Sequence, residues 1–467
     1  MSDALEQRLA AAAAAEAAGR IAEAAGLLAG LEAAIRDRPA ALHLAGVVAA
    51  RQGDFARAAP LMDRAAKLGA AKLGPKAGLA PAALALVHRN RIEAHRRLLN
   101  PKAAIAAGRE ALALAPDDPV ALNNLALAHF DALEIDAALA CYDRAIALAP
   151  EDPAPRFGRG EVLLACGDLA RGWEGYGWRF RLPGVPPPLP PEIAARPRIR
   201  RWQGRRMEGT LLVVADQGFG DVVQFARFLP WAAARCGRLV VAASPEMQPV
   251  VAQLPGVAER ITAWDRLGEF RAWAALSDLP GLAGPEPGAA PPYLAGTHED
   301  RMRWAARLAE LLPRGQRRVG LVWAGRPNHP FDFARSASLA ALAPLGEVPG
   351  VAWVALQVGE AAAQVAGTAW RAPLVNLGPE LASYADTMAV LDGLDLVVTV
   401  DTSVAHVAGA MGRPCWLMLA RRPDWRWGLA GEATAWYPSV RLFRQKRLGD
   451  WAGLARELGR ALAAGGC

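Results

Sequence analysis

The segment VVTVDTSVAHVAGAMGRP, residues 397–414, places polar side chains where an apolar strand gives way to a helix of small residues. Asp401, Thr402 and Ser403 stand at this junction, and His406 follows one turn later. Side chains of these types cap helices by accepting hydrogen bonds from unpaired amides. The same amides, aided by the helix dipole, also bind anions such as a diphosphate. The segment alone leaves both explanations open.

A second junction of this kind lies in VVADQGFGDVVQFARFLP, residues 213–230. Gly218 and Gly220 permit a tight strand-to-helix turn and the close approach of another molecule's backbone or sugar. The dinucleotide fingerprint GxGxxG is absent, because its third glycine is replaced by Val223. Asp221 is either a first-turn residue favoured by the helix dipole or a general base for an acceptor hydroxyl.

Arginines follow the strand in GLVWAGRPNHPFDFARSASLAAL, residues 320–342. Arg326 and Arg335 suit bidentate contact with a phosphate, and the alternative is that they are ordinary surface-loop charges. Loops after neighbouring strands of an open sheet face the same crevice, so we expect Arg335 to approach the amides of Thr402, Ser403 and Val404.

His406 and four weaker candidates complete the predicted site. Because His406 lies on the same helical face as Thr402, we expect it to contact the same ligand, and the alternative is a structural histidine. Gln217 is expected to line the acceptor side. The residues that follow strand ends on the same edge, and could contact a ribose or base, are Gln357, Asp386 and Thr387.

Short runs rich in Val and Leu alternate with amphipathic helical stretches after residue 208, which is typical of parallel sheets buried on both faces. A Gly/Pro-rich break at 279–296 divides this region. We therefore predict two Rossmann-like domains, at 209–312 and 313–467. A cleft at the carboxyl ends of their strands is the expected ligand site.

The first third of the chain repeats. Residues 102–119 are followed 34 residues later by a similar stretch at 136–153, and this period resembles the tetratricopeptide repeat (TPR). With weaker copies at 53–70 and 161–182, it predicts a helical array over 1–182. Such arrays bind peptides or partner proteins on a concave face; the alternative is that the array only supports the two domains after it.

A linker rich in Pro and Arg is predicted at 183–208, because proline removes backbone donors and ends helices. Its arginines could contact nucleic acid, but no aromatic residues are interleaved among them, so a solvated linker docked on an acidic surface is favoured.

The overall composition agrees with a folded, multi-domain chain. Its 467 residues are 53% hydrophobic and 21% charged, with a net charge of +7 that is too mild to indicate nucleic-acid binding. The five scattered cysteines suggest neither disulfides nor zinc. The sequence contains no signal peptide and no apolar run of about 18 residues, so we expect a cytoplasmic protein without a membrane span.

Three stretches resemble the heptosyltransferase-like glycosyltransferases of family nine: GFGDVVQFARFLP, VGLVWAGRP and, most specifically, DLVVTVDTSVAHVAGAMGRPCWLML. Together with the repeats, GWEGYGWRF and the PDWRWG stretch within 423–445, the chain resembles bacterial TPR glycosyltransferases. Those are distant relatives of the protein O-GlcNAc transferases.

The resemblance implies a GT-B fold, with the acceptor bound by the first Rossmann-like domain and the nucleotide-sugar donor by the second. It implies that Asp221 is the catalytic base and that the segment from Asp401 to His406 holds the donor diphosphate. It also implies a basic residue that neutralises the leaving group, for which Arg335 is the first choice and Arg326 the second.

Two departures from the family pattern concern the donor contacts: Asp216 replaces a Glu, and Phe331 replaces an Asn. The sequence also lacks the Glu-x7-Glu pair of many retaining GT-B enzymes and any Asp-x-Asp in a strand-end loop. These absences favour an inverting reaction without metal or cofactor.

We therefore predict an inverting glycosyltransferase that acts on a protein or peptide bound with help of the repeats. Two alternatives remain: the same chemistry on lipopolysaccharide sugars, or a non-catalytic TPR scaffold that carries a glycosyltransferase-like domain.

Overall fold

The computed structural model describes residues 2–70, 78–196, 198–284 and 290–465. These residues form two compact units, Met1–Val162 and Leu163–Cys467. The division falls before the predicted end of the repeats at residue 182, so the last repeat-like stretch belongs to the second unit.

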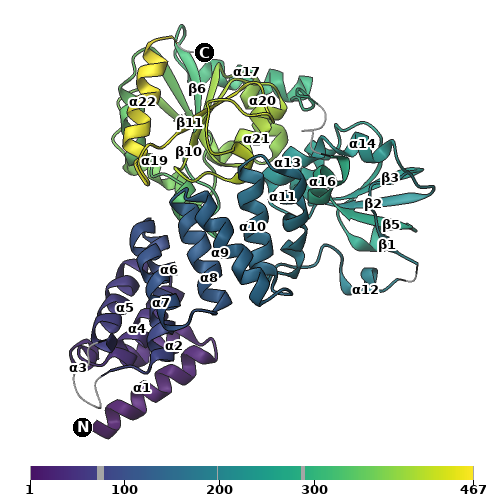
Figure 1. The fold of residues 1–467 in the computed structure, drawn as a ribbon. Helices are drawn as coiled ribbons and strands as arrows, with labels where there is room; N and C mark the ends of the chain where they lie inside the picture. The colour runs from purple at the N-terminus through teal and green to yellow at the C-terminus, as the bar shows by residue number, and fades with distance from the viewer. Residues whose placement is uncertain (1, 71–77, 197, 285–289, 466–467) are drawn as a thin grey trace. The chain divides into compact units, whose positions relative to one another are not determined.

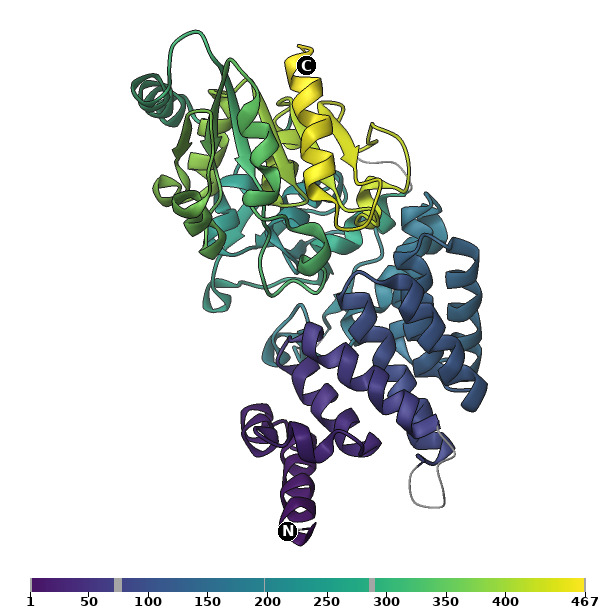
Figure 2. The same cartoon turned by 90° about the vertical axis from the view of Figure 1, so that its left-hand side faces the viewer.

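The first unit is built from helices, as the repeats predict (Figure 2). Consecutive helices pack as pairs, α4 with α5, α6 with α7 and α8 with α9. Their bounds are α1 Ser2–Ala17, α2 Ile21–Leu28, α3 Glu32–Ile35, α4 Pro39–Arg51, α5 Phe55–Ala70, α6 Pro81–Arg97, α7 Pro101–Leu114, α8 Pro119–Asp131 and α9 Ile135–Leu148; α10, Pro153–Ala165, crosses into the second unit.

Small residues let these helices approach closely. A Cβ atom added at Gly108 of α7 would lie 2.7 Å from a side-chain atom of Leu125 in α8. Proline begins both helices, and Asn100 and Asp118 cap them by accepting backbone amides. The local signals and the packing therefore agree at each helix start.

The second unit contains two parallel sheets (Figure 1). The first has the order β1-β5-β2-β3-β4 and the second the order β11-β10-β9-β6-β7-β8. Their bounds are β1 Arg200–Arg201, β2 Thr210–Val214, β3 Arg238–Ala242, β4 Val257–Ile261, β5 Ala272–Ala275, β6 Arg317–Val322, β7 Val351–Ala355, β8 Leu374–Asn376, β9 Leu396–Val400, β10 Cys415–Leu419 and β11 Val440–Arg444.

Helices accompany both sheets. They are α11 Leu169–Tyr176, α12 Pro191–Ala194, α13 Phe219–Ala226, α14 Leu229–Ala233, α15 Gln248–Val251, α16 Leu279–Ala283, α17 His298–Leu311, α18 Asp332–Arg335, α19 Gln364–Gly367, α20 Tyr384–Asp392, α21 Ser403–Ala410 and α22 Trp451–Ala463.

The order of the second sheet is that of a doubly wound Rossmann sheet, with β6 and β9 at the point where the chain reverses its direction of winding. Every residue of β7, β9 and β10 is buried, because helices cover both faces. This confirms the predicted helical array followed by two Rossmann-like domains in a GT-B arrangement. None of the described helices is long and apolar enough to cross a membrane.

The predicted linker is more ordered than expected. Leu189 and Ile193 are buried in the core beside the first sheet, and β1 pairs in parallel with β5. Proline ends the helices in this segment, as predicted, but the segment packs along the edge of the first sheet and is not a solvated linker. The expected docking on acidic groups occurs at Arg201, which donates to Asp278 at 2.7 Å.

The segment after α10 is fixed to the first sheet by Arg179, which lies in the 3-10 helix η1, Gly177–Arg181. Its guanidinium donates to Asp278 at 2.6 Å and to Ser277 at 2.5 Å. Ser277 in turn donates its amide to Asp216 at the end of β2. Arg179 therefore closes the end of β2 and β5, where the first sheet reverses its winding.

We expect Arg179→Met to lower the free energy of unfolding of the second unit by about 3 kcal/mol, because it leaves buried Asp216 without its cation and Asp278 with Arg201 alone. Urea unfolding measures this change. Arg181→Met is the matched control, since that side chain is exposed. Equal stability of the two variants would contradict the role given to Arg179.

Candidate active site

The loops after β6 and β9 meet at the reversal point of the second sheet. Arg335 donates from Nη1 to the carbonyl oxygen of Asp401 at 3.2 Å, and its Nε lies 3.4 Å from Asp332 Oδ1. The side chain is mostly buried. The predicted approach of Arg335 to the start of α21 is therefore present in the fold.

The side chains at the start of α21 do not cap it. Thr402 is the N-cap residue, with extended backbone and no side-chain cap bond. Its hydroxyl lies 3.0 Å from that of Thr399, and Ser403 Oγ accepts from Tyr384 at 2.7 Å. The hydroxyls are thus engaged elsewhere and leave the first amides of the helix uncapped. Of the two explanations for this junction, the geometry favours an anion site over a simple cap.

Asp401 precedes this helix and carries a perturbed acid group. Burial, and then the negative charge of Asp424, raise its pKa to about 6, and Arg335 opposes them. A carboxyl group in this state changes charge near neutral pH, in direct contact with the helix start. An arriving anion would favour its protonated form further.

His406 has a different environment from the one predicted. Its side chain is 4% exposed, stacks on Trp427 with a centroid separation of 5.1 Å, and places Nδ1 3.0 Å from the Tyr437 hydroxyl. Burial, and then Arg426, lower its pKa to about 3, so the ring is neutral. These contacts give His406 a packing role, and a donor contact stays a prediction.

Gly220 brings the two Rossmann-like domains together at this histidine. Helix α13 of the first domain packs against α21 of the second. A Cβ atom added at Gly220 would lie 2.8 Å from His406 Cδ2 and 3.5 Å from Ser403 Cα. The close approach predicted at Gly220 is therefore real, but its partner is the protein's own helix and not a ligand.

Asp221 lies one residue further along α13 and is bonded to Arg426, which follows β10 in the second domain. Arg426 also donates to Asp424 at 2.7 Å and to Gln224 at 2.6 Å. Burial raises the pKa of Asp221, and the Arg426 charge opposes it. The sequence motif PDWRWG contains Arg426, but nothing in its spacing indicated a partner on α13.

Gly218 leaves space in front of this carboxylate. It is exposed, and a Cβ atom added there would have Asp221 Oδ2, at 3.2 Å, as its one neighbour within 4 Å among the described residues. Gln217, the other predicted acceptor-side residue, accepts the Tyr176 hydroxyl at 2.9 Å. The open side of Asp221 is thus bordered by Gly218.

Arg326 does not join Arg335. Its guanidinium carbon lies 4.2 Å from the ring centroid of Phe219, the first residue of α13. The same ring packs edge-on against Tyr384. Arg326 therefore contributes to the contact between the two domains and lies at the rim of the site.

The side chain of Gln357, a predicted donor contact, is fully hydrogen-bonded to nearby backbone, and its contact with a donor stays a prediction. Its side chain is 3% exposed, its oxygen accepts the amides of Trp323 and Ala324, and its nitrogen donates to the carbonyls of Ala324 and Val358. Both lone pairs and both hydrogens of the amide are used. Gln357 instead fixes the loop after β6.

Asp386 and Thr387 also bond to the protein itself, and their predicted contacts with a ribose or base stay predictions. Asp386 closes a capping box with Ser383 and accepts from Arg303 at 2.6 Å and from Trp304 at 3.1 Å. Thr387 is buried and donates to the Ser383 carbonyl. Asp386 thus satisfies amides at the start of α20, whereas Thr387 bonds back to a carbonyl of the same turn.

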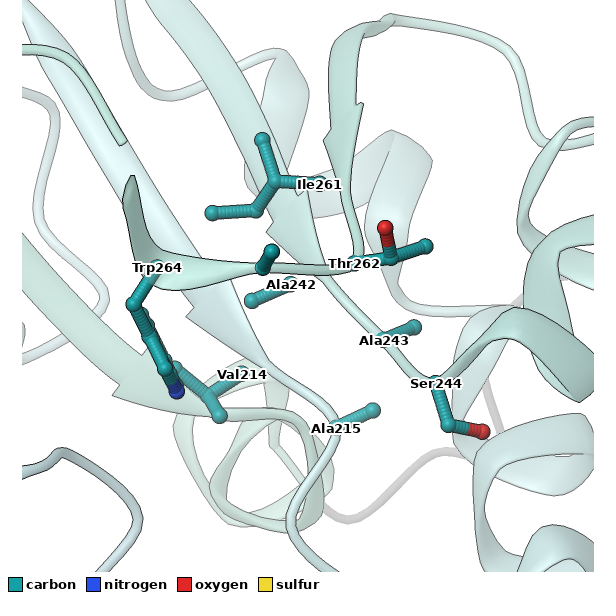
Figure 3. A pocket seen from close by; sticks show the side chains of 9 residues that line it. Val214, Ala215, Ala242, Ala243, Ser244, Ile261, Thr262 and Trp264 are labelled. Carbon is teal, nitrogen blue, oxygen red and sulfur yellow. The ribbon is translucent and has the colours of Figure 1, made fainter. Parts of the chain in front are cut away.

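A small pocket of about 160 Å³, open to solvent, lies at the carboxyl ends of β2, β3 and β4. Small side chains form much of its wall, with Trp264 on one side and the hydroxyls of Ser244 and Thr262 near its edge (Figure 3). One of its lining residues, Ala215, directly precedes the loop that leads to Gly218. Among the described residues, no group of His, Cys, Asp and Glu is arranged to hold a metal ion.

We expect Gly220→Ala to lower the free energy of unfolding by about 1–3 kcal/mol, because the added methyl overlaps His406. Gly218→Ala is the matched control: its φ of −62° suits any residue, and the methyl meets open space apart from the Asp221 carboxylate. Thermal unfolding of both variants measures the difference, and equal melting temperatures would contradict the packing role of Gly220.

The raised pKa of Asp401 predicts a pH-dependent stability. The protonated form is favoured in the folded state, so this contribution is complete below about pH 4 and is lost as pH rises through about 6. Asp401→Asn removes that loss and should be more stable than wild type at pH 7 by about 1–3 kcal/mol. Urea unfolding between pH 4 and 7 tests this, with the exposed Asp265→Asn as control. A constant difference between wild type and Asp401→Asn across that range would contradict it.

Comparison with known proteins supports the assignment of the second unit. Residues 351–427 match the model of glycosyltransferase family 9 (heptosyltransferase), a stretch that contains Asp401, His406 and Arg426. The chain is 31% identical to Protein FlbA of Caulobacter vibrioides over 73% of its own length. It spans 61% of the length of that relative.

Two solved structures are similar to separate parts of the chain. E. coli ADP-heptose lps heptosyltransferase II is 16% identical, with a TM-score of 0.38, and the match covers 55% of this chain and 99% of that one. The MamA RS-1 ArsTM double mutant is 18% identical, with a TM-score of 0.32, and the match covers 38% of this chain and 94% of that one. The chain joins a TPR-like helical array to a unit in which residues 351–427 match the model of glycosyltransferase family 9.

Proposed function

We propose that the second unit is an inverting, metal-independent glycosyltransferase that moves a sugar from a nucleotide-sugar to an acceptor hydroxyl. The observation that carries the proposal is the contact of α13 with α21. It puts Asp221 and an uncapped helix start into one junction.

The start of α21 binds the diphosphate of the donor in this proposal. The amides at Thr402, Ser403 and Val404 carry the positive end of the helix dipole, and Arg335 lies beside them on the Asp401 carbonyl. Fixed positive groups of this kind stabilise charge that develops on a leaving group. They would therefore do electrostatically what a metal ion does in other transferases.

Asp221 acts as the base. It takes the proton of the acceptor hydroxyl, whose oxygen then bonds to the anomeric carbon of the sugar. The bond from that carbon to the phosphate oxygen breaks, and the nucleoside diphosphate leaves with the bonding electron pair. Attack from the side opposite the leaving group inverts the anomeric centre.

The acceptor approaches from the first domain. Gly218 leaves the side of Asp221 Oδ2 open, and the pocket at the ends of β2, β3 and β4 adjoins the same loop. Helical arrays such as the first unit are typical protein-binding scaffolds. We therefore favour a protein or peptide acceptor, held partly by the array. Because the five cysteines are scattered and form no CxxC pair, we place the reaction in the cytoplasm.

Thermal unfolding with ADP, UDP and GDP and their sugar conjugates tests the donor site. A hundredfold excess over Kd should raise the melting temperature of wild type by about 5–10 °C. Arg335→Ala should lose most of this rise, whereas Arg326→Ala should keep it. Asp221→Asn should keep the rise but lose nucleoside diphosphate release by about a hundredfold or more.

Two results would contradict the proposal. If no nucleotide changed the melting temperature of wild type at millimolar concentration, the proposed donor site would be wrong. Full turnover of Asp221→Asn would remove the proposed base while leaving the donor site in place.

A further inference from the structure

We propose that Arg426 is a positioning residue for the catalytic base: it holds the Asp221 carboxylate in one orientation and links it to the donor-binding domain. The inference rests on the proposed function, because it gives Asp221 the role of base. Arg426 belongs to the second Rossmann-like domain, whereas the base that it holds belongs to the first.

Arg426 bonds to side chains of both Rossmann-like domains. Its Nη2 bonds to Asp221 Oδ1, its Nε donates to Gln224 on the same helix, and its Nη1 donates to Asp424 in its own loop. The side chain is 9% exposed. A planar guanidinium with partners in three directions has little freedom, so the carboxylate it holds is fixed as well.

Arg426 bonds to one oxygen of the base and leaves the other able to accept a proton. It bonds to Asp221 Oδ1, whereas Oδ2 lies beside exposed Gly218, and the amides of Gly218 and Asp221 also hydrogen-bond to the carboxylate. A carboxylate bound through one oxygen can still take a proton on the other. The arrangement therefore points the reactive oxygen of Asp221 towards the open side of the loop.

Aromatic side chains hold the Arg426 loop in place. The guanidinium carbon lies 4.5 Å from the ring centroid of Trp425, and that ring packs edge-on against Trp173 at 5.1 Å and Tyr176 at 5.9 Å. Both partners belong to α11, the helix that comes after the repeats. The segment that continues the array is thus part of the support for the base.

The charged groups around Asp221 act in opposite directions. Burial raises its pKa, Arg426 lowers it, and Asp424 raises it, whereas the amides of Gly218 and of Asp221 itself lower it. Tyr176 of α11 lies close enough for its ionisation to be affected by Asp221, and on α21 His406 is neutral. Removing Arg426 and removing Asp424 must therefore shift the pKa of Asp221 in opposite directions.

The experiment measures the pH dependence of nucleoside diphosphate release by the full-length protein. This release also reports transfer of the sugar to water, so no acceptor has to be identified. The substrate is the nucleotide-sugar that gives the largest thermal shift. In Arg426→Met the acidic limb of kcat should move to higher pH by about one unit or more, and kcat at neutral pH should fall roughly tenfold or more. In Asp424→Asn the acidic limb should move to lower pH. KM for the nucleotide-sugar should change little in either.

Arg426→Lys keeps the positive charge but can bond to fewer partners. Compared with Arg426→Met, it should therefore return the acidic limb of the pH profile to its wild-type position and recover only part of kcat. This variant also serves if Arg426→Met does not fold. Arg421→Gln is the matched control, since Arg421 lies in the same loop, is exposed and bonds to the Lys446 carbonyl.

The outcomes separate the two levels of the proposal. The positioning role of Arg426 would be overturned if the acidic limb moved in the same direction in Arg426→Met and Asp424→Asn, or if both variants kept the wild-type pH profile. Either result would leave the proposed sugar transfer intact. A wild type that releases no nucleoside diphosphate from any nucleotide-sugar would overturn the proposed function and this inference together.

Discussion

The contact between the starts of α13 and α21 is the constraint on which the site depends. Gly220 permits it, because any side chain there would overlap His406. Two helix starts that meet bring together two positive ends of helix dipoles, which repel one another. Among the carboxylates in or beside this junction, Asp424 is held in its charged form and offsets that repulsion, whereas burial raises the pKa values of Asp221 and Asp401.

The balance of charge at the junction explains which groups titrate. Arg426 bonds to Asp221 and Asp424, and it holds the pKa of Asp424 below its ordinary value despite burial. Asp401 bonds to Arg335 through its carbonyl oxygen, and burial followed by the charge of Asp424 raises the pKa of its carboxyl group. A diphosphate at the start of α21 would therefore meet an acid that can take up a proton, which lowers the repulsion between them.

The segment between the repeats and the first sheet is part of the same arrangement. Arg179 closes the end of β2 and β5, Tyr176 binds Gln217, and Trp173 packs against Trp425. At the far end of α13, Arg227 donates twice to the Trp436 carbonyl at 3.0 Å. Helix α13 is therefore held at both ends by residues distant in sequence. Asp221, as the proposed base, needs this support, because a small displacement of a catalytic group costs much of its effect.

The sequence by itself determined the helical array, the two parallel sheets and the residues at the strand ends, because apolar periodicity and turn residues are local signals. It also placed Asp221, Arg335 and the Asp401–His406 segment on the edges that meet. It could not show that Gln357, Asp386 and Thr387 spend their polar atoms on nearby backbone and side chains, nor that Arg426 binds Asp221 across 205 positions of chain. Those partners come together only when the domains pack. Hydrogen bonding of a side chain is decided by its neighbours in space, and tertiary structure alone supplies them.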